Sequence, residues 1–317
     1  MKRIVSTLLA VVLLSVLCVP ALAASSLTMG TGGTSGTYYA YGSVLAQFIS
    51  DNAEMSVTAI STGGSTDNID QIEFEYAELG FSQSDVAYYA YNGLNFEQFI
   101  GKPITSFCAL AALYNEAVQL VTCNPEIKSM ADLKGKNVSV GSAGSGTYFN
   151  ALDFLAAYDM TLEDINPQYL SFGDSAEALK DGKIDAAFVV AGAPTPAVTD
   201  LCATKGAYLI GLDEEHTARL IEINPAYTKC PIPAGTYTGI DEDVVTVAIK
   251  AVVLASKNLS EEDAYTIVST IFENKDEITS LHAKGAELDA EYASECGIPY
   301  HAGAAKYFAE KGIEVLQ

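Results

Sequence analysis

The sequence predicts an α/β protein built from two lobes, and three observations support this. The chain has 317 residues, which at about 150 residues per domain is enough for two units with separate cores. Short apolar runs alternate with polar loops and with segments of helical period, a pattern typical of parallel α/β sheets. A glycine loop ending in Gly-Thr-Tyr occurs twice, at 36–38 and 146–148. We therefore expect one such loop in each lobe.

The first 23 residues have the features of a secretory signal peptide. Lys2 and Arg3 precede an apolar run over 4–19, and Ala21-Leu22-Ala23 fits a cleavage site of small residues. We expect the mature chain to begin near Ala24 and to be periplasmic. No later segment approaches the roughly 20 apolar residues that a membrane span needs.

Charge restricts the classes of ligand. The formal net charge is −23, and it becomes more negative once Lys2 and Arg3 are removed, which argues against nucleic-acid binding. Arg219 is the single arginine beyond the signal segment, whereas bidentate arginine is the usual clamp for a carboxylate or phosphate. An anionic ligand therefore needs another kind of host.

Three strand–loop–helix units are expected in the first lobe. Strands over 27–29, 57–60 and 79–82 each precede a polar loop and a helix, with Ser84 as an N-cap and Gly93 as the end of the third helix. Glycine loops of this kind leave the first N–H groups of a helix free beside Ser and Thr hydroxyls. Such helix starts favour an anion.

The segment 104–125 differs, because two apolar runs surround Asn115-Glu116; it predicts extended strands that cross between the lobes. Beyond it, strands are expected over 138–141, 169–172, 184–192 and 208–212. Helices are expected from Tyr148 and over 174–182, and Ser260 is expected to cap a later helix. The predicted organisation is a signal peptide at 1–23, a discontinuous lobe one at 24–113 and 212–317, and lobe two at 114–211.

Motifs for catalysis and metal binding are weak. The histidines His216, His282 and His301 lie far apart in sequence and provide no ligand pair or obvious base. Neither a Gly-x-Ser-x-Gly turn nor a Gly-Lys-Ser/Thr phosphate loop occurs. We expect no catalytic residue, no metal and no cofactor.

Five cysteines follow the signal segment. In an oxidising compartment they allow two disulfides and one free thiol, and the sequence does not choose among the pairings. They are Cys108, Cys123, Cys202, Cys230 and Cys296.

Six segments in this order resemble the TAXI family of solute-binding proteins, which serve tripartite ATP-independent periplasmic (TRAP) transporters. They are GTGGTSGTYYAYG, ISTGGSTDNI, GFSQSDVAYYAYNG, VSVGSAGSGT, DAAFVVAGAPTPAV and IPAGTYTGIDEDVVTVAI. The resemblance implies a type II periplasmic-binding-protein fold, with a hinge of crossing strands and a ligand cleft between the lobes. It also implies a small acidic solute such as glutamate or 2-oxoglutarate, and a TRAP membrane subunit that receives it. We expect a monomer that is not an enzyme.

The resemblance places the ligand at five groups of residues. Lobe one would contribute Thr31, Gly32, Thr34, Ser35, Gly36, Thr37 and Tyr38, together with Gly63, Gly64 and Ser65. The third loop would add Gln83, Ser84 and Asp85, where Asp85 either recognises an amine or caps its helix. Lobe two would add Ser145, Gly146 and Thr147, and the cleft lining at 191–194, which includes Gly192 and Pro194. Two alternatives stay open: a ligand sensor that signals to a membrane receptor, and a secreted enzyme that uses the same cleft.

Overall fold

The first lobe is built on three parallel strands. The computed structural model describes residues 25–317, so the predicted signal peptide lies outside the described residues. Strand β1 (Ser25–Gly30) lies between β2 (Met55–Ile60) and β3 (Leu79–Gln83). Each is followed by a helix: α2 (Thr37–Asn52), α3 (Ser65–Glu73) and α4 (Ser84–Asn92). The three predicted strand–loop–helix units are confirmed.

The second lobe repeats this arrangement. Strand β5 (Asn137–Ser139) lies between β6 (Asn166–Gln168) and β7 (Ala186–Ala191), again in parallel. Helices α5 (Thr147–Ala157), α6 (Phe172–Lys180) and α7 (Pro196–Thr204) follow them. Strand β8 (Tyr208–Ile210) returns antiparallel to the crossing strand β4, within the segment predicted at 208–212.

One predicted strand and one predicted cap are wrong. The strand expected over 169–172 lies at β6 instead, and helix α6 already begins at Phe172. The reason is Ser171, whose Oγ accepts a 3.1 Å hydrogen bond from the backbone N–H of Asp174 and so caps the helix. In the third loop the N-cap is Gln83, and Ser84 is the first helical residue. Gly93 ends that helix in the left-handed conformation, with φ of 65°, as predicted.

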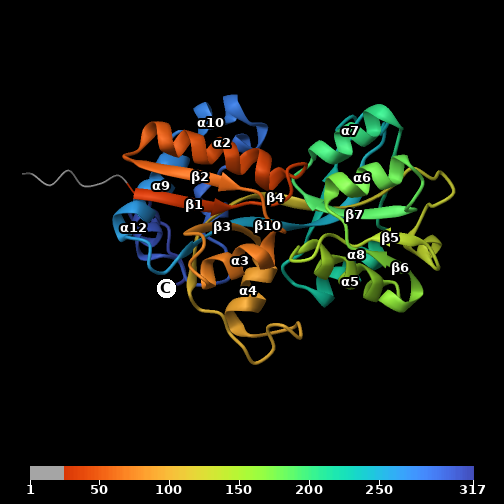
Figure 1. Ribbon diagram of the computed structural model, residues 1–317, viewed down its shortest axis with the longest axis horizontal. Coiled ribbons are helices and arrows are strands. Elements are labelled where there is room, and N and C mark those ends of the chain that lie inside the picture. Colours follow the sequence, from red (N-terminus) through yellow and green to blue (C-terminus); the bar gives the residue numbers. More distant parts are fainter. Residues whose placement is uncertain (1–24) are drawn as a thin grey trace, which may run out of the picture.

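Two long antiparallel strands run through both lobes (Figure 1). Strand β4 (Phe107–Thr122) pairs with β10 (Val244–Ser256). Strand β3 joins the second half of β10, while β7 joins the second half of β4 and β9 (Thr228–Ile232) joins the first half of β10. The predicted crossing at 104–125 is confirmed, although it is one continuous strand, because Asn115 and Glu116 pair in register with Lys250 and Ile249.

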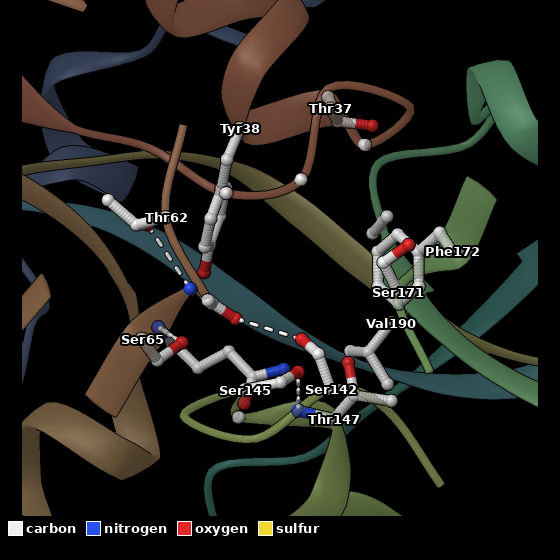
Figure 2. A pocket seen from close by; sticks show the side chains of 18 of the residues that line it. Thr37, Tyr38, Thr62, Ser65, Ser142, Ser145, Thr147, Ser171, Phe172 and Val190 are labelled. Carbon is white, nitrogen blue, oxygen red and sulfur yellow. Dashed lines mark hydrogen bonds between the residues drawn. The ribbon is translucent and has the colours of Figure 1, made fainter. Parts of the chain in front are cut away.

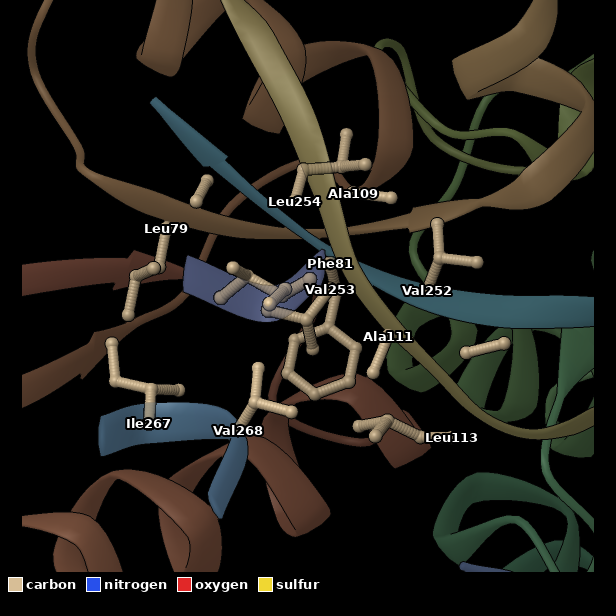
Figure 3. Close-up of a cluster of buried hydrophobic side chains, with 14 of the residues drawn as sticks. Leu79, Phe81, Ala109, Ala111, Leu113, Val252, Val253, Leu254, Ile267 and Val268 are labelled. Carbon is tan, nitrogen blue, oxygen red and sulfur yellow. The ribbon is translucent and has the colours of Figure 1, made fainter. Parts of the chain in front are cut away.

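The core of the first lobe forms where the crossing strands meet the parallel strands and the C-terminal helices (Figure 3). Phe81, Val253 and Val268 are almost completely buried there. Helix α9 (Glu261–Glu273) packs on α12 (Ala302–Glu310), and α10 (Lys275–Leu281) and α11 (Ala290–Ala293) complete the lobe. The hydroxyl of Ser260 accepts a 2.9 Å hydrogen bond from the N–H of Asp263, which confirms the predicted cap of α9.

The second lobe has two hydrophobic clusters. Helix α8 (Glu214–Ile223) packs on α5, and Leu220, Tyr227 and Val247 share a cluster with Leu155. Residues from 212 to about 249 thus pack with the second lobe, although the sequence assigned them to the first. We propose that the chain returns to lobe one within β10 and not at 211/212, since a boundary belongs where few contacts cross.

Membrane spans and disulfides were also examined within residues 25–317. None of the helices there combines the length and apolar character of a bilayer span. The five cysteines of this part are all free thiols. The possibility of two disulfides, which the sequence left open, is therefore not realised in the structure.

Candidate functional site

A cavity of about 300 Å³ lies between the two lobes (Figure 2). This volume is at the lower end of the range for small-molecule sites. Its wall is rich in glycine residues and hydroxyl groups. The lining residues are Gly32, Gly33, Thr34, Gly36, Thr37, Tyr38, Ser61, Thr62, Gly63, Gly64, Ser65, Gln83, Glu116, Ser142, Ser145, Gly146, Thr147, Ser171, Phe172, Val190 and Ala191.

Four helices begin at this cavity. The first helical residues of α2, α3, α5 and α6 (Thr37, Ser65, Thr147 and Phe172) all line it. These helices follow parallel strands, and ligands of α/β sheets bind beyond the carboxyl ends of such strands. The N–H groups of Thr37 and Tyr38 donate to no acceptor within residues 25–317. The cavity thus receives free donors and the positive ends of helix dipoles.

Backbone N–H groups at the start of α3 donate hydrogen bonds to the opposite lobe. The carbonyl of Gly144 accepts hydrogen bonds of 3.0 and 3.2 Å from the N–H groups of Thr66 and Asp67. Further bonds between the lobes are Thr37 Oγ1 to Gly192 O at 2.9 Å, Gln83 Nε2 to Asn150 Oδ1 at 2.8 Å, and Ala197 N to Ser35 O at 3.1 Å. The lobes are therefore in contact around the cavity.

Asn68 fixes the loops of the first lobe. This residue is fully buried on α3, and its Nδ2 donates to the carbonyl oxygens of Thr31 at 2.6 Å and Phe81 at 2.8 Å. Its Oδ1 accepts from the hydroxyl of Thr62 at 2.7 Å. One amide thus ties the loops that follow β1 and β2 to strand β3.

Glu116 is the one ionisable carboxyl group on the described cavity wall. It lies on the crossing strand β4, is 1% exposed, and accepts a 2.6 Å hydrogen bond from the hydroxyl of Tyr38. Burial raises the pKa of Glu116 well above its ordinary value, while the Tyr38 hydrogen bond and the charge of Lys284 act to lower that pKa. Lysine, arginine and histidine are absent from this wall as the structure describes it.

Gln83 contributes a second acceptor. It is 2% exposed, and its backbone N–H donates to Ser65 Oγ at 3.1 Å. Its Oε1 is buried and has no hydrogen-bond partner in the described chain. A Cβ atom at Gly146 would collide with this oxygen and would lie 2.8 Å from Ser65 Oγ, so a larger residue there would force the side chains of Gln83 and Ser65 to move.

Comparison with known proteins agrees with this two-lobed architecture. Residues 29–312 match the NMT1-like family. The chain belongs to that family.

Three solved structures resemble this NMT1-like protein in fold. The alkanesulfonate-binding protein SsuA from Xanthomonas axonopodis pv. citri, bound to MOPS, has a TM-score of 0.52 at 16% identity, covering 91% of this chain and 85% of its own. A protein from Bordetella bronchiseptica has a TM-score of 0.54 at 18% identity, and the match covers 90% of this chain and 89% of that protein. A putative L-cystine ABC transporter from Listeria monocytogenes has a TM-score of 0.51 at 15% identity, and the match covers 85% of this chain and 98% of that protein. The fold is the two-lobed fold of periplasmic binding proteins, as predicted.

The cavity of this NMT1-like protein gathers most of the predicted ligand residues. Their contact with a ligand stays a prediction. The predicted residues on the wall are Gly32, Thr34, Gly36, Thr37, Tyr38, Gly63, Gly64, Ser65, Gln83, Ser145, Gly146 and Thr147, and Ala191 joins them.

Four other predicted residues lie outside the wall and have structural contacts. The hydroxyl of Thr31 donates to the carbonyl of Ile60 at 2.6 Å. Ser35 and Gly192 supply two of the carbonyl groups that join the lobes. Pro194 follows β7 behind the wall.

Ser84 and Asp85 also lie elsewhere. They line a separate cavity of about 500 Å³, which includes Lys250. Asp85 Oδ1 accepts from the N–H of Val86 at 2.8 Å, and Oδ2 accepts from Asn224 Nδ2 at 2.9 Å and Asn150 Nδ2 at 3.4 Å. Burial raises the pKa of Asp85 to about 6. Of the two roles left open for Asp85, recognition of an amine in the first cavity does not agree with this position.

Sequence reasoning missed several wall residues. Glu116 was noticed only as a polar interruption between two apolar runs, although a lone carboxyl group inside a predicted buried strand is itself a signal. Ser171 and Phe172 were missed because α6 begins earlier than predicted. The other missed residues are Gly33, Ser61, Thr62, Ser142 and Val190.

The three histidines and Arg219 lie away from the cavity wall. His216 stacks on Tyr158 with ring centroids 3.6 Å apart, and His282 packs beside Tyr41 at 5.0 Å. Arg219 pairs with the exposed Asp159 at 2.7 Å. The base that a secreted enzyme would need is not provided at this cavity by any of these histidines.

Proposed function

We propose that this protein is an extracytoplasmic solute-binding receptor. It captures a small acidic solute, of the class of glutamate or 2-oxoglutarate, between its lobes, and it delivers the solute to the membrane subunit of a TRAP-type, ion-driven transporter. The observation that carries the proposal is the convergence of four helix starts on one cavity between two lobes.

The cavity chemistry supports a carboxylate ligand. Free N–H groups at Thr37 and Tyr38 and the hydroxyl of Thr147 are neutral donors on opposite walls. Each hydrogen bond from such a donor to a charged group contributes about 1.5 to 3 kcal/mol. Four or five of them suffice for micromolar affinity after association costs. An arginine is then unnecessary.

The topology supports capture by closure. Within residues 25–317, two long strands, β4 and β10, run through both lobes, and further contacts between the lobes lie both at the cavity and beside it, where Phe96 stacks on Phe149. A pair of strands of this kind acts as a hinge, and the ligand then becomes part of the interface that closes. An exported location rests on the predicted signal peptide and on this fold.

A first experiment tests the solute class. The mature chain is refolded without ligand, and its melting temperature is recorded with glutamate, glutamine, 2-oxoglutarate, succinate, branched-chain amino acids, sugars and phosphate. A solute at 100 times its Kd should stabilise the fold by about 2.7 kcal/mol, a shift of a few degrees. We expect the dicarboxylates to give the shift. A shift with neutral amino acids or sugars alone would contradict the proposed acidic solute.

A second experiment tests the partner. The purified protein, loaded with the radiolabelled solute found above, is added to vesicles that contain the candidate membrane subunit. Uptake should require an imposed ion gradient and should not require ATP. Uptake that depends on ATP would indicate an ABC-type partner, of the kind named for the Listeria relative. Signalling without uptake would instead favour the sensor.

A further inference from the structure

The cavity wall carries two chemically different kinds of group. Helix starts at Thr37 and Thr147 present donors, whereas Glu116 and Gln83 present oxygen acceptors. We propose that Glu116, supported by Gln83 Oε1, recognises an ammonium group, so that the solute is an α-amino acid and not the corresponding 2-oxo acid. This inference rests on the proposed solute-binding function and narrows its substrate.

The first step concerns the charge of Glu116: on the described cavity wall, no cationic side chain lies beside Glu116 to neutralise it. The cationic group that acts on it is Lys284, which lies behind the wall and is paired with Glu287. A buried carboxyl group is costly to ionise unless a positive charge joins it. A ligand ammonium group would supply that charge inside the cavity.

The second step is the orientation of Gln83. Asn150 Nδ2 donates to Tyr227 Oη at 2.7 Å and faces the carboxylate of Asp85, so Asn150 Oδ1 is left to accept from Gln83 Nε2. Because Nε2 of Gln83 is thereby occupied, Oε1 is the atom at the Gly146 side of the cavity. This orphan acceptor needs a donor, which an ammonium group has and a carboxylate lacks.

A dicarboxylate fits these acceptors less well. Its second carboxylate would meet Glu116 and Gln83 Oε1, and the repulsion is avoided only if Glu116 keeps a proton and donates it. The hydroxyl of Tyr38 is already used as a donor to Glu116. An ammonium group therefore satisfies both acceptors, whereas an oxo group satisfies neither.

The charged neighbours of Glu116 determine how binding responds to pH. Tyr38 on α2 donates to it, Asp85 on α4 repels its charge, and Lys284, between α10 and α11, attracts it. Tyr114 and Tyr292 also interact with it. Burial and the charge of Asp85 raise the pKa of Glu116, and a ligand ammonium group beside the carboxyl group would lower that pKa again. Amino-acid binding should thus release up to one proton, and the Kd should fall up to tenfold for each unit of rising pH.

The test uses matched pairs of solutes that differ only in the amine. Isothermal calorimetry is run with L-glutamate against 2-oxoglutarate and with L-leucine against 4-methyl-2-oxopentanoate, in two buffers of different ionisation enthalpy. In any pair that binds, we expect the amino acid to bind at least about 100-fold more tightly than its 2-oxo acid and to release protons on binding. Equal or tighter binding of the oxo acid overturns the inference and leaves the binding-protein proposal intact.

The remaining outcomes separate the two proposals. Binding of leucine without glutamate supports the ammonium subsite and contradicts the acidic solute. If no amine-bearing solute binds while another class does, the ammonium subsite is overturned. If no solute of either class binds to protein that melts cooperatively, both proposals fail.

Two variants test whether Glu116 is the group that binds the ammonium group of the solute. Glu116→Gln keeps the acceptor for Tyr38 but loses the charge, and it should weaken amino-acid binding at least about tenfold and abolish proton release. The matched control is Glu295→Gln, which removes the exposed carboxylate that pairs with Lys250. This variant should leave the amino-acid affinity and the proton release unchanged. Unchanged affinity in a Glu116→Gln protein that melts like the parent overturns the inference.

Discussion

The hydroxyl of Tyr38 on helix α2 donates a 2.6 Å hydrogen bond to the carboxyl group of Glu116 on the crossing strand β4. One residue belongs to the glycine loop of the first lobe, and the other belongs to a strand that continues into the second lobe. The bond thus links the wall of the cavity to the hinge. Since both residues line the cavity, a ligand at this point contacts the hinge directly.

Replacement of Tyr38 by phenylalanine should show what this bond contributes. Tyr38→Phe leaves the buried Glu116 without its donor, so we expect a loss of about 1 to 3 kcal/mol in the free energy of unfolding. Urea denaturation of ligand-free protein measures this. Tyr39→Phe, one residue further on, is the control and should change stability by less than about 0.5 kcal/mol. Equal effects of the two variants would show that the bond contributes nothing specific.

Gly146 should be needed for closure. A methyl group there would meet Gln83 and Ser65 of the other lobe, a contact that exists only while the lobes touch. Gly146→Ala should therefore weaken solute binding at least about tenfold and leave the melting temperature of each lobe nearly unchanged. Small-angle scattering with and without solute should show no compaction. Gly211→Ala, outside the cavity wall, should bind and compact normally.

The glycine loops could be predicted because their chemistry is local. Gly36 and Gly146 stand before Thr-Tyr at the start of a helix-period segment, and both helices begin at the threonine. Such a start depends on a few consecutive residues, so the sequence reveals it. The position of each loop at a strand end then brings both to one edge of the sheet.

The two acceptors on the cavity wall depend on distant residues. Glu116 reaches the wall because β4 passes through both lobes, and the orientation of Gln83 depends on Asn150 in the other lobe. Asn68 joins two loops and strand β3, which are separate in sequence. The boundary that we propose within β10, in place of 211/212, also depends on distant residues, because α8 packs on α5 only in the folded chain. No local pattern encodes these pairings.

The five cysteines should all react as thiols. Each is a free thiol in the structure, and burial raises the pKa of Cys296 to about 12, which suppresses its reactive thiolate. Alkylation of the unfolded mature chain followed by mass spectrometry should find five modified cysteines, with or without prior reduction. Modification of only three or one before reduction would reveal disulfides and contradict the free-thiol arrangement.

The buried carboxyl groups between the lobes should make stability fall as pH rises. Burial raises the pKa of Asp85 to about 6 and of Asp153 to about 7, and the charge of Asp85 adds to the shift at Asp153. The folded protein holds these protons more tightly than the unfolded chain. The stabilisation is therefore complete below about pH 4, the ordinary range of aspartate, and is lost as pH rises through about 7.

Asp153→Asn should remove much of this dependence. The amide cannot ionise, and its oxygen still accepts from the hydroxyl of Tyr227, which donates to Asp153 at 3.0 Å. We expect the free energy of unfolding of the variant, measured relative to that of the parent, to rise by about 2 to 4 kcal/mol at most as pH increases from 4.5 to 8. Urea denaturation at pH 4.5, 6 and 8 measures the difference. Asp241→Asn, at an exposed loop position, should follow the parent at each pH. An Asp153→Asn curve parallel to the parent would show that this carboxyl group does not titrate between the folded and unfolded states.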